Sequence, residues 1–382
     1  MVDGATERTG ELVVAGHDGV VEEVLDATDC VVTPGLVNAH HHLLQSAFRT
    51  LPGTRGVAMR DWLPAMAAAY RRVGHDPELY ALAASVGVAE GLLCGVTTIA
   101  DHHLNWPHGA PVADTVALAR ATVGAARALG GRLVFVRGSA LDDPAWAAAS
   151  ADAVVTALVP DPRAEGPGGV SADGMLQVAV GPAGAHSDRR ETFLALGEVA
   201  RRHRLRRRTQ ANEQVDTAIA LEKYGRRPLD LLEEWGWLEP DVTIAHLCDV
   251  TDEEIGRLAA AGVTATHAPG CDVPMGWGVA PVARLLEAGV RVGLGTSGGG
   301  SNDAGHLRPG TAGDLCVWDV SGVADAGVAD PLAGLLWASP GRRPRHVVVG
   351  GRVVVRDYRL VTADEAELVA RLRDRLRRTP PV

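Results

Sequence analysis

Cysteine is scarce in this chain, and long apolar runs and a leader pattern are absent. The five cysteines are scattered without CxxC spacing, which indicates reduced thiols and excludes a disulfide framework. No apolar run approaches the eighteen or so residues of a membrane span. The first residues, MVDGATERTGELVV, lack the charged and then apolar layout of a signal peptide. We therefore expect a soluble, cytoplasmic protein with no membrane partner.

Positive charge is also in deficit, because the formal net charge is -10. A surface of that sign repels phosphate, so we expect no nucleic-acid partner. The one basic run, RRHRLRRR at residues 201–208, begins where a helical pattern ends and leads into a strand. We interpret it as a solvated helix end whose cations face the negative pole of the helix.

The 382 residues suffice for one large core with a small appended domain. Short β-branched runs alternate with long segments rich in alanine and leucine, which is typical of repeated βα units around a parallel sheet. Eight parallel strands predict a closed (β/α)8 barrel of the TIM type. The eight runs are residues 30–40, 95–101, 132–138, 176–182, 207–212, 242–247, 263–270 and 290–297.

The two ends of the chain differ from its middle. Short strands with glycine turns are predicted near residues 11–27, 313–320 and 345–355, and they indicate a small β domain built from both termini. The expected division is residues 1–33 for the first part of the β domain, 34–305 for the barrel, and 306–382 for the rest of the β domain. The last part also contains an amphipathic packing helix near residues 363–378.

Polar residues gather where the predicted strands end, the face at which barrels of this kind collect their chemistry. Two histidines separated by one residue on a strand project to the same side, so His40 and His42 can bind one ion while His41 faces away. Glu213 and His246 follow two later strands and reach the same mouth. Further candidates at these strand ends are Asp101, His102, His103, His186, Gln210, His267, Asp272, Ser297, Asn302 and Asp303. For His103 and His267, a hydrogen-bonded structural role is the simpler interpretation.

Several motifs in the same order resemble the amidohydrolase superfamily, in its triazine hydrolase and 8-oxoguanine deaminase-like group. They are TPGLVNAHHHLLQSAFR, GVTTIADHH, VTIAHLCDVTDEEIGRLAAAGV, GLGTSGGGSND and LRPGTAGDLCVWD, and they run over nearly the whole chain. The resemblance implies a distorted (β/α)8 barrel with a flanking β domain and one divalent ion, zinc or a similar metal. It also implies hydrolytic loss of ammonia or another group from a heteroaromatic ring.

The resemblance gives roles to individual residues. His40 and His42 match the first pair of metal ligands, Glu213 matches the proton-shuttling glutamate, and His246 matches the histidine beside the attacked centre, which here could be a third metal ligand. Gln45 falls on a position that holds the substrate ring, and Trp62 and Trp277 fall in segments that line the pocket. The other expected substrate contacts are His102, Gln210 and Ser297.

Two positions depart from the family pattern. Gln210 stands where a metal-binding histidine is expected, and Ser297 stands where an aspartate normally binds the ion and takes a proton from water. Glutamine is a feeble zinc ligand, and serine is no base at neutral pH. Asp272 is the nearest spare carboxylate and is a candidate substitute, although an aspartate in a loop is also a common turn residue. Lys223, the only lysine, lies on a predicted helix, which sets aside two ions bridged by a modified lysine.

A third departure concerns architecture. After SNDAG the chain passes directly into HLRPGTAGDL, so the segment that carries the last barrel helix looks absent. The wall left without a helix must be covered by other parts of the chain or by a second subunit, which favours a homodimer.

Three functions remain open on these residues. The first is a metal-dependent hydrolase or deaminase acting on a C–N bond, other than a peptide bond, of an aminated heterocycle that is purine-, pterin- or triazine-like. The second keeps the pocket but performs altered chemistry in a specialised pathway. The third is a catalytically inactive binding homologue.

Overall fold

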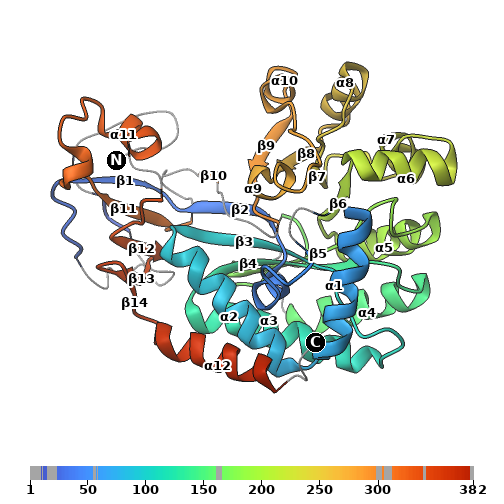
Figure 1. The fold of residues 1–382 in the computed structure, drawn as a ribbon, viewed down its shortest axis with the longest axis horizontal. Helices are drawn as coiled ribbons and strands as arrows, with labels where there is room; N and C mark the ends of the chain where they lie inside the picture. Colours follow the sequence, from blue (N-terminus) through green and yellow to red (C-terminus); the bar gives the residue numbers. More distant parts are fainter. Residues whose placement is uncertain are drawn as a thin grey trace.

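The computed structural model describes residues 10, 12–14, 24–54, 57, 59–160, 166–297, 303–304, 312–338 and 341–378. Two sheets organise these residues, a large parallel sheet with helices around it and a small antiparallel sheet at one side (Figure 1). Asn302 and much of the predicted first part of the β domain lie outside the described residues. None of the described helices is long and apolar enough to cross a bilayer.

The large sheet is the predicted barrel. Its strands are parallel from β2 to β9, and each pairs with the next along the chain. They are β2 (Leu36–His41), β3 (Val96–His103), β4 (Arg132–Ser139), β5 (Leu176–Pro182), β6 (Arg207–Ala211), β7 (Val242–His246), β8 (Thr264–His267) and β9 (Arg291–Leu294). The first predicted run, residues 30–40, divides between β1 (Cys30–Pro34) of the small sheet and β2 of the barrel, because Gly35 lies between two strands that pair in different sheets.

The barrel closes through a short contact between its first and last strands. The backbone N–H groups of Thr296 and Ser297 donate to the carbonyl of His40 at 2.8 and 2.9 Å. This contact brings the end of β9 beside the two predicted metal-binding histidines of β2.

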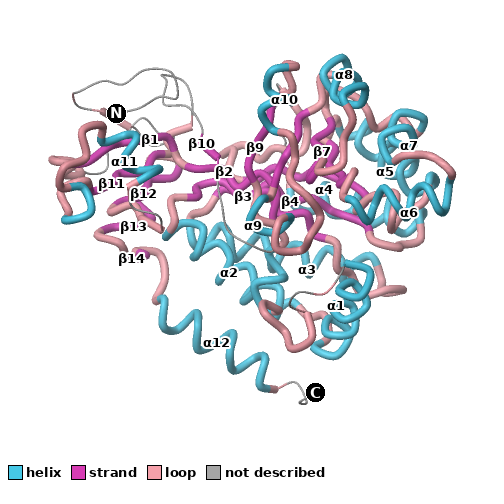
Figure 2. The backbone as a smooth tube through the Cα atoms, turned by 45° about the horizontal axis from the view of Figure 1, so that its top comes forward, coloured by secondary structure: helices cyan, strands magenta, loops and turns pink. Residues whose placement is uncertain are grey.

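Helices surround the barrel in the order that the alternating sequence predicts (Figure 2). They are η1 (Leu43–Ala47), α1 (Met59–Val73), α2 (Pro77–Leu93), α3 (Val112–Leu129), α4 (Pro144–Leu158), α5 (Arg190–His203), α6 (Gln214–Tyr224), α7 (Pro228–Glu234), α8 (Asp252–Ala261), α9 (Pro269–Asp272) and α10 (Val282–Glu287). The predicted helix starts are present: the Asp76 carboxylate accepts from the backbone N–H of Leu79, and Thr251 and Glu254 form a capping box.

No helix follows β9 in the described part of the stretch that leads to the small sheet, namely residues 295–297, 303–304 and 312–314. A short strand, β10 (Asp303–Ala304), pairs antiparallel with β2 there. Residues 298–302 and 305–311 of this stretch lie outside the described residues, so the absence of the last barrel helix stays a prediction.

The small sheet joins the two ends of the chain, as predicted. Its order is β1, β11 (Leu315–Asp319), β12 (His346–Val349), β13 (Arg352–Arg356) and β14 (Arg359–Leu360), with all neighbours antiparallel. Gly350 and Gly351 both have positive φ and make the turn between β12 and β13, which suits the twist of a two-residue hairpin. Two further elements, η2 (Val323–Asp325) and α11 (Pro331–Trp337), lie between β11 and β12.

The C-terminal helix α12 (Glu365–Arg377) packs beside α2 (Figure 1). Arg375 forms ion pairs with Asp76 and Glu78 at the start of α2, and Arg378 donates to Glu78 at 2.7 Å. The helix therefore serves as packing for the barrel wall, in agreement with its amphipathic pattern.

The basic run at residues 201–208 divides between solvent and the interior. Arg201 and Arg202 are exposed at the end of α5, as expected of a solvated helix end. Arg207 instead has a side chain only 8% exposed and pairs with Asp241 at 2.7 Å. The run is therefore not one continuous cationic surface.

Candidate active site

The two histidines that open the site lie at the end of β2, His40 on the strand and His42 directly after it. The His40 and His42 rings have centroids 4.9 Å apart, whereas His41 forms a separate hydrogen bond through Nδ1 with the Thr296 hydroxyl at 2.7 Å. Alternation of side chains along an extended strand produces this arrangement. The spacing in the sequence thus places two imidazoles together and removes the third from them.

Both of these imidazoles keep a nitrogen lone pair available. His42 Nδ1 lies 2.7 Å from the carbonyl of His102, so this nitrogen carries the proton and Nε2 keeps the lone pair. His40 Nε2 is buried and has no hydrogen-bond partner among the described residues. Burial lowers the pKa of His42 to about 4, and burial together with the neighbouring imidazoles lowers the pKa of His40 well below its usual range. Both side chains are therefore neutral at pH 7, the form that binds metal ions.

Glu213 is the N-cap of helix α6 and directly precedes it. Its side chain is fully buried, and neither carboxylate oxygen has a hydrogen-bond donor in the described structure. Among the described residues its ion-pair partner is His246, whose Nε2 lies 3.4 Å from Glu213 Oε1. Burial raises the pKa of Glu213. A buried carboxylate that lacks donors is expensive, and such groups are characteristic of catalytic acids and bases.

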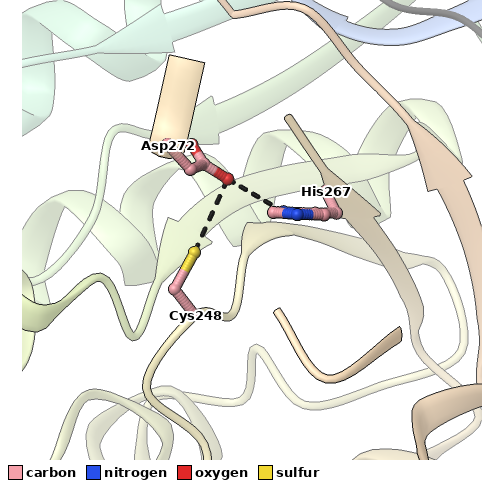
Figure 3. A group of neighbouring side chains, drawn as sticks. All are labelled: Cys248, His267 and Asp272. Carbon is pink, nitrogen blue, oxygen red and sulfur yellow. Dashed lines mark hydrogen bonds and ion pairs between the residues drawn. The ribbon is translucent and has the colours of Figure 1, made fainter. Parts of the chain in front are cut away.

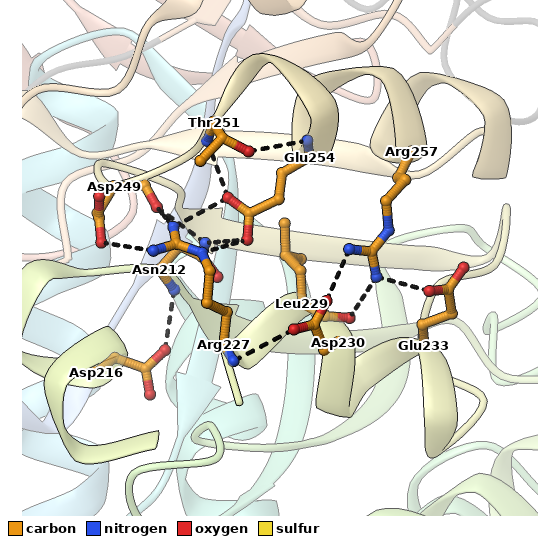
Figure 4. A network of polar contacts seen from close by, with 10 residues as sticks. All are labelled: Asn212, Asp216, Arg227, Leu229, Asp230, Glu233, Asp249, Thr251, Glu254 and Arg257. Atoms are coloured by element: carbon orange, nitrogen blue, oxygen red, sulfur yellow. Dashed lines mark hydrogen bonds and ion pairs between the residues drawn. The ribbon is translucent and has the colours of Figure 1, made fainter. Parts of the chain in front are cut away.

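A polar network of residues that follow β6 and β7 fixes the backbone before Glu213 (Figure 4). Asn212 has a left-handed φ of +56°, its backbone N–H donates to Asp216 at 2.9 Å, and its side chain donates to the carbonyl of Asp249 at 2.9 Å. Arg227 ties the same loop to Glu254 through hydrogen bonds of 2.8 and 3.0 Å. These contacts hold Glu213 against the mouth of the barrel without contacting its carboxylate.

His246 stands between two acidic groups at the end of β7. Its Nδ1 lies 2.8 Å from Asp272 Oδ1, and on the opposite edge its Nε2 lies 3.4 Å from Glu213 Oε1 and 3.2 Å from Gln210 Oε1. Burial alone would lower the pKa of His246, but the carboxylates of Glu213 and Asp272 outweigh it and raise the pKa. Both ring nitrogens therefore face acceptors, which favours the doubly protonated ring.

Asp272, the candidate substitute for the missing aspartate, contacts Nδ1 of His246, the ring nitrogen that faces away from Glu213 and Gln210. It is fully buried, and its second oxygen is 2.9 Å from His267 Nδ1 and accepts a weaker contact from Cys248 Sγ at 3.5 Å (Figure 3). Burial would raise the pKa of Asp272, but hydrogen bonds from His246 and His267 hold it well below its usual range. The carboxylate is thus the hub of a cluster that holds two imidazoles in place.

The atoms of Cys248, His267 and Asp272 also lie within 4.8 Å of one another and are of metal-ligating type. However, Asp272 already accepts hydrogen bonds from two imidazoles and a further contact from the Ala268 backbone N–H at 3.3 Å. This cluster therefore has a complete explanation as a positioning group. The hydrogen bond between His267 and Asp272 agrees with the structural role predicted for His267.

The two residues that depart from the family pattern both lie at the mouth. Gln210 reaches His246 through Oε1, and its Nε2 lies 3.5 Å from His102 Nδ1. Ser297 is buried at the point of barrel closure, with φ +45° and its backbone N–H bound to the carbonyl of His40. The site thus carries a neutral amide and a hydroxyl at the positions where the resemblance implies an imidazole and a carboxylate.

A cavity of about 690 Å³ opens beside these groups. Its lining includes five of the six predicted substrate contacts: Gln45, Trp62, Gln210, Trp277 and Ser297. His42 also lines it, whereas His102 is not among the lining residues. The Trp277 ring centroid is 5.4 Å from that of His246, and its buried indole N–H has no acceptor in the described part of the protein. The cavity therefore offers flat aromatic walls with hydrogen-bonding groups at their edges.

His186 is a site residue that the sequence placed at a strand end without a role. It lines the cavity, and its Nδ1 lies 3.1 Å from the buried carboxylate of Asp216. Burial lowers the pKa of His186, but the hydrogen bond and charge of Asp216 outweigh it, so the pKa is raised. Only the pairing with Asp216, 30 residues downstream, distinguishes His186 from an ordinary buried histidine, and nothing in the sequence signals that pairing.

The residues fit a divalent ion. His40 Nε2 is a buried donor atom without a partner, and His42 is oriented by a backbone carbonyl, as metal-binding histidines usually are. Nearby, Glu213 supplies a buried negative charge that no protein donor satisfies. An ion bound by the two imidazoles would supply the partner that His40 Nε2 lacks.

Comparison with known proteins agrees with this geometry. Residues 31–307 match the model of the Amidohydrolase family. The chain is 31% identical to an 8-oxoguanine deaminase of Pseudomonas aeruginosa, over 91% of this chain and 87% of that protein. It is 33% identical to an isoxanthopterin deaminase of an unknown prokaryotic organism, over 75% of this chain and 60% of that protein.

The fold is shared with solved structures. The crystal structure of an atrazine chlorohydrolase from Arthrobacter aurescens, complexed with zinc, superposes with a TM-score of 0.80 at 29% identity. The match covers 91% of this chain and 88% of that chain.

Proposed function

This protein belongs to the amidohydrolase family, as its sequence motifs predict, and we propose that it is a divalent-metal hydrolase that deaminates a planar nitrogen heterocycle. The overall reaction adds water to the ring carbon that bears the amino group. A C–O bond forms, the C–N bond breaks, and the departing nitrogen takes a proton and leaves as ammonia.

The observation that carries this proposal is the state of Glu213. A fully buried carboxylate whose two oxygens lack protein donors is costly to fold, so a protein retains it only where it has a partner or a task. Glu213 stands next to His246 Nε2, on the helix that begins at the mouth of the barrel. A raised pKa suits a group that accepts a proton from water and passes it to a leaving amine.

The other residues have complementary tasks. His40 and His42 would hold the ion, which when bound lowers the pKa of its water from about 15.7 toward about 7. His246, held by Asp272, presents a hydrogen-bond donor toward Gln210 and Glu213. General acid-base assistance by such groups typically contributes about 10²- to 10⁴-fold in rate.

The cavity supports a flat heterocycle as substrate. Trp62 and Trp277 supply aromatic surfaces, and the Trp277 indole N–H and the Gln45 amide supply hydrogen bonds to the ring edge. The names of the relatives, 8-oxoguanine deaminase and isoxanthopterin deaminase, make purine- and pterin-like rings the first to test. Triazine-like rings follow from the solved atrazine chlorohydrolase.

Gln210 and Ser297 favour a second candidate, a homologue that binds such rings without hydrolysing them or that catalyses a different step on them. A neutral amide and a hydroxyl contribute little to binding an ion or to removing a proton from its water. The homodimer, the lack of nucleic-acid binding, the cytoplasmic location and the three domain boundaries remain predictions.

The test combines elemental analysis with an ammonia-release screen over aminated purines, pterins and triazines. The proposal expects one bound zinc, iron or manganese per chain and ammonia from at least one ring. The Glu213→Gln variant, expected to lose about 10²- to 10⁴-fold of the activity, serves as the matched control for contaminating deaminases. The proposal would be contradicted by a protein that binds no metal ion and gains no activity when metal is added. If ammonia is released only by a variant that carries Gln210→His with Ser297→Asp, the natural protein is not an ordinary deaminase.

A further inference from the structure

We propose that His186 determines the specificity of the cavity, because its Nε2 donates a hydrogen bond to a negatively charged oxygen of the ring that the cavity binds. This inference rests on the proposed function and narrows its substrate to rings that carry an ionised oxo group or a carboxylate. Three features of the molecule support it: the carboxylate behind the His186 ring, the ring nitrogen that faces the cavity, and the charge of the cavity lining.

One edge of the His186 ring is held by a buried carboxylate. His186 lies between β5 and α5, and its Nδ1 is 3.1 Å from Oδ1 of Asp216, whose side chain is 1% exposed. The other oxygen of Asp216 accepts from the backbone N–H of Asn212 at 2.9 Å. Because both carboxylate oxygens accept, Nδ1 of His186 supplies the proton of this pair.

The opposite edge of the ring faces the cavity. Nε2 has no hydrogen-bond partner among the described residues, yet it is not enclosed by protein as Nε2 of His40 is. The His186 side chain is only 6% exposed, and the residue lines the cavity. The Nδ1 edge is tightly seated, since a Cβ at Gly184 would lie 2.7 Å from Nδ1. Nε2 is therefore the atom that a bound ring can reach.

The groups around His186 favour a ring that is protonated on both nitrogens. They are the carboxyl groups of Asp216 on α6, of Glu213 at the N-cap of that helix, and of Asp188 in the segment after β5. Burial lowers the pKa of His186, but the hydrogen bond to Asp216 and these charges outweigh it and raise the pKa. A negative oxygen at Nε2 would favour the same form. An imidazolium donates on both edges, so the group that meets Nε2 has to be an acceptor.

The lining of the cavity has the charge that an anion requires. Among the described residues that line it there are two arginines, Arg49 and Arg71, and no aspartate or glutamate. The net charge of the whole chain is -10, so composition does not explain the missing carboxylates. Arg49 pairs with Glu90, whereas Arg71 is exposed at the end of α1. A cavity lined by cations without carboxylates attracts negatively charged ligands.

A second histidine of the lining, His75, has the opposite character. Its Nδ1 lies 2.7 Å from the Tyr80 hydroxyl, and that hydroxyl donates to the carbonyl of Asn105. Nδ1 of His75 therefore donates to Tyr80, and its Nε2 keeps the lone pair. Burial lowers the pKa of His75 to about 4, so the ring is neutral at pH 7. His75 thus provides a matched control, a histidine of the same cavity that is held by a neutral partner.

The test measures equilibrium binding of rings that have no amino group, so that no deamination takes place during the titration. Urate and xanthine differ by one exocyclic oxygen and by the negative charge that urate carries at neutral pH. Lumazine-6-carboxylate and lumazine differ by a carboxylate. Titration calorimetry at pH 7 gives the affinity ratio of each pair for wild type, His186→Gln, Asp216→Asn and the control His75→Gln. Circular dichroism and thermal melting verify that each variant folds.

We expect wild type to prefer the anionic member of at least one pair. His186→Gln should reduce that preference by about 10- to 100-fold, the effect of losing a hydrogen bond to a charged group. Asp216→Asn keeps the imidazole but removes the charge behind it, so it should reduce the preference by a smaller factor. His75→Gln should change the affinities of both members equally and leave their ratio unchanged.

The pair whose ratio responds identifies the source of the negative oxygen, an oxo group for urate or a substituent for the lumazine carboxylate. Equal binding of both members of each pair by wild type would overturn the inference, as would an undiminished preference in His186→Gln. Absence of binding by wild type would also overturn it, while the ammonia-release screen decides separately whether the proposed function survives.

Should His186→Gln not fold, Asp216→Asn and a crystal structure of wild type with the preferred ring decide the question. The negative oxygen should lie about 3 Å from Nε2 of His186. An oxygen bound elsewhere, or an unchanged preference in Asp216→Asn, would overturn the inference.

Discussion

Replacement of Asp272 by asparagine should separate the charge of the carboxylate from its shape. The carboxylate accepts hydrogen bonds from His246 at 2.8 Å and from His267 at 2.9 Å in a fully buried position. Hydrogen bonds to a charged group contribute about 1.5–3 kcal/mol each, against about 0.5–1.5 kcal/mol for neutral ones. Losing the charge at two such bonds should therefore lower the free energy of unfolding by about 2–3 kcal/mol.

The asparagine amide also presents N–H groups to one of the two imidazoles. That ring must then take its other tautomer or lose its hydrogen bond. His246 would no longer be held as a donor toward Glu213, so kcat should fall together with the free energy of unfolding.

Thermal unfolding followed by circular dichroism checks the stability, and for a chain of 382 residues a loss of about 2–3 kcal/mol corresponds to a decrease in Tm of about 2–4 °C. The matched control is Asp188→Asn. Asp188 is equally buried but accepts from neutral donors, the Ser139 hydroxyl at 2.7 Å and the Ala183 N–H at 3.1 Å. It should lose less than about 1 kcal/mol at pH 7. Equal losses in the two variants would refute the argument that the charge of Asp272 is what holds the histidines.

The pH dependence gives a second check on Asp272. Because its pKa is held below the usual value, its contribution is present above about pH 4 and is lost as the pH falls through the folded pKa. The difference in stability between wild type and Asp272→Asn should therefore narrow as the pH falls below about 4. A difference that widens toward acid would contradict this.

Three more predictions follow from individual residues. Burial raises the pKa of Asp188 to about 7, so wild type should lose stability relative to Asp188→Asn as the pH rises from about 4 through 7. The same change of stability with pH in both proteins would contradict this. Gly181→Ala should lower the free energy of unfolding by more than about 3 kcal/mol or prevent folding, because the new Cβ would lie 1.5 Å from the carbonyl oxygen of Arg208. The control Gly124→Ala, whose Cβ would have no atom within 4 Å, should be neutral or stabilising. Glu213→Gln should reduce kcat by about 10²- to 10⁴-fold while retaining the fold, and a fully active variant would remove Glu213 from the mechanism.

Much of the architecture could be predicted from the sequence because it depends on local periodicity. The alternation of β-branched runs with alanine- and leucine-rich segments indicated all eight barrel strands, and the terminal segments indicated the small sheet. The capping box at Thr251 and the proline after Asp76 marked two helix starts correctly. Where one run contained two strands, at residues 30–40, periodicity alone did not reveal that Gly35 separates pairing in two different sheets.

The sequence also determined which chemical groups are present at the mouth of the barrel and which are missing. The spacing of His40 and His42 was enough to bring their rings to one side of a strand, because side-chain direction alternates with every residue. The sequence alone likewise shows that Gln210 and Ser297 stand where the family pattern has a histidine and an aspartate. The order of strands then placed Glu213 and His246 beside each other, since parallel strands end at the same face.

Only the tertiary structure decided what each imidazole can do. The same side chain is a metal ligand, a proton donor or a structural group according to which of its two nitrogens meets a carbonyl or a carboxylate. Those partners, Gly181 for His102 and Asp272 for His246, lie 79 and 26 residues away in sequence. Folding brings such partners within about 3 Å, and no periodicity in the chain encodes that proximity.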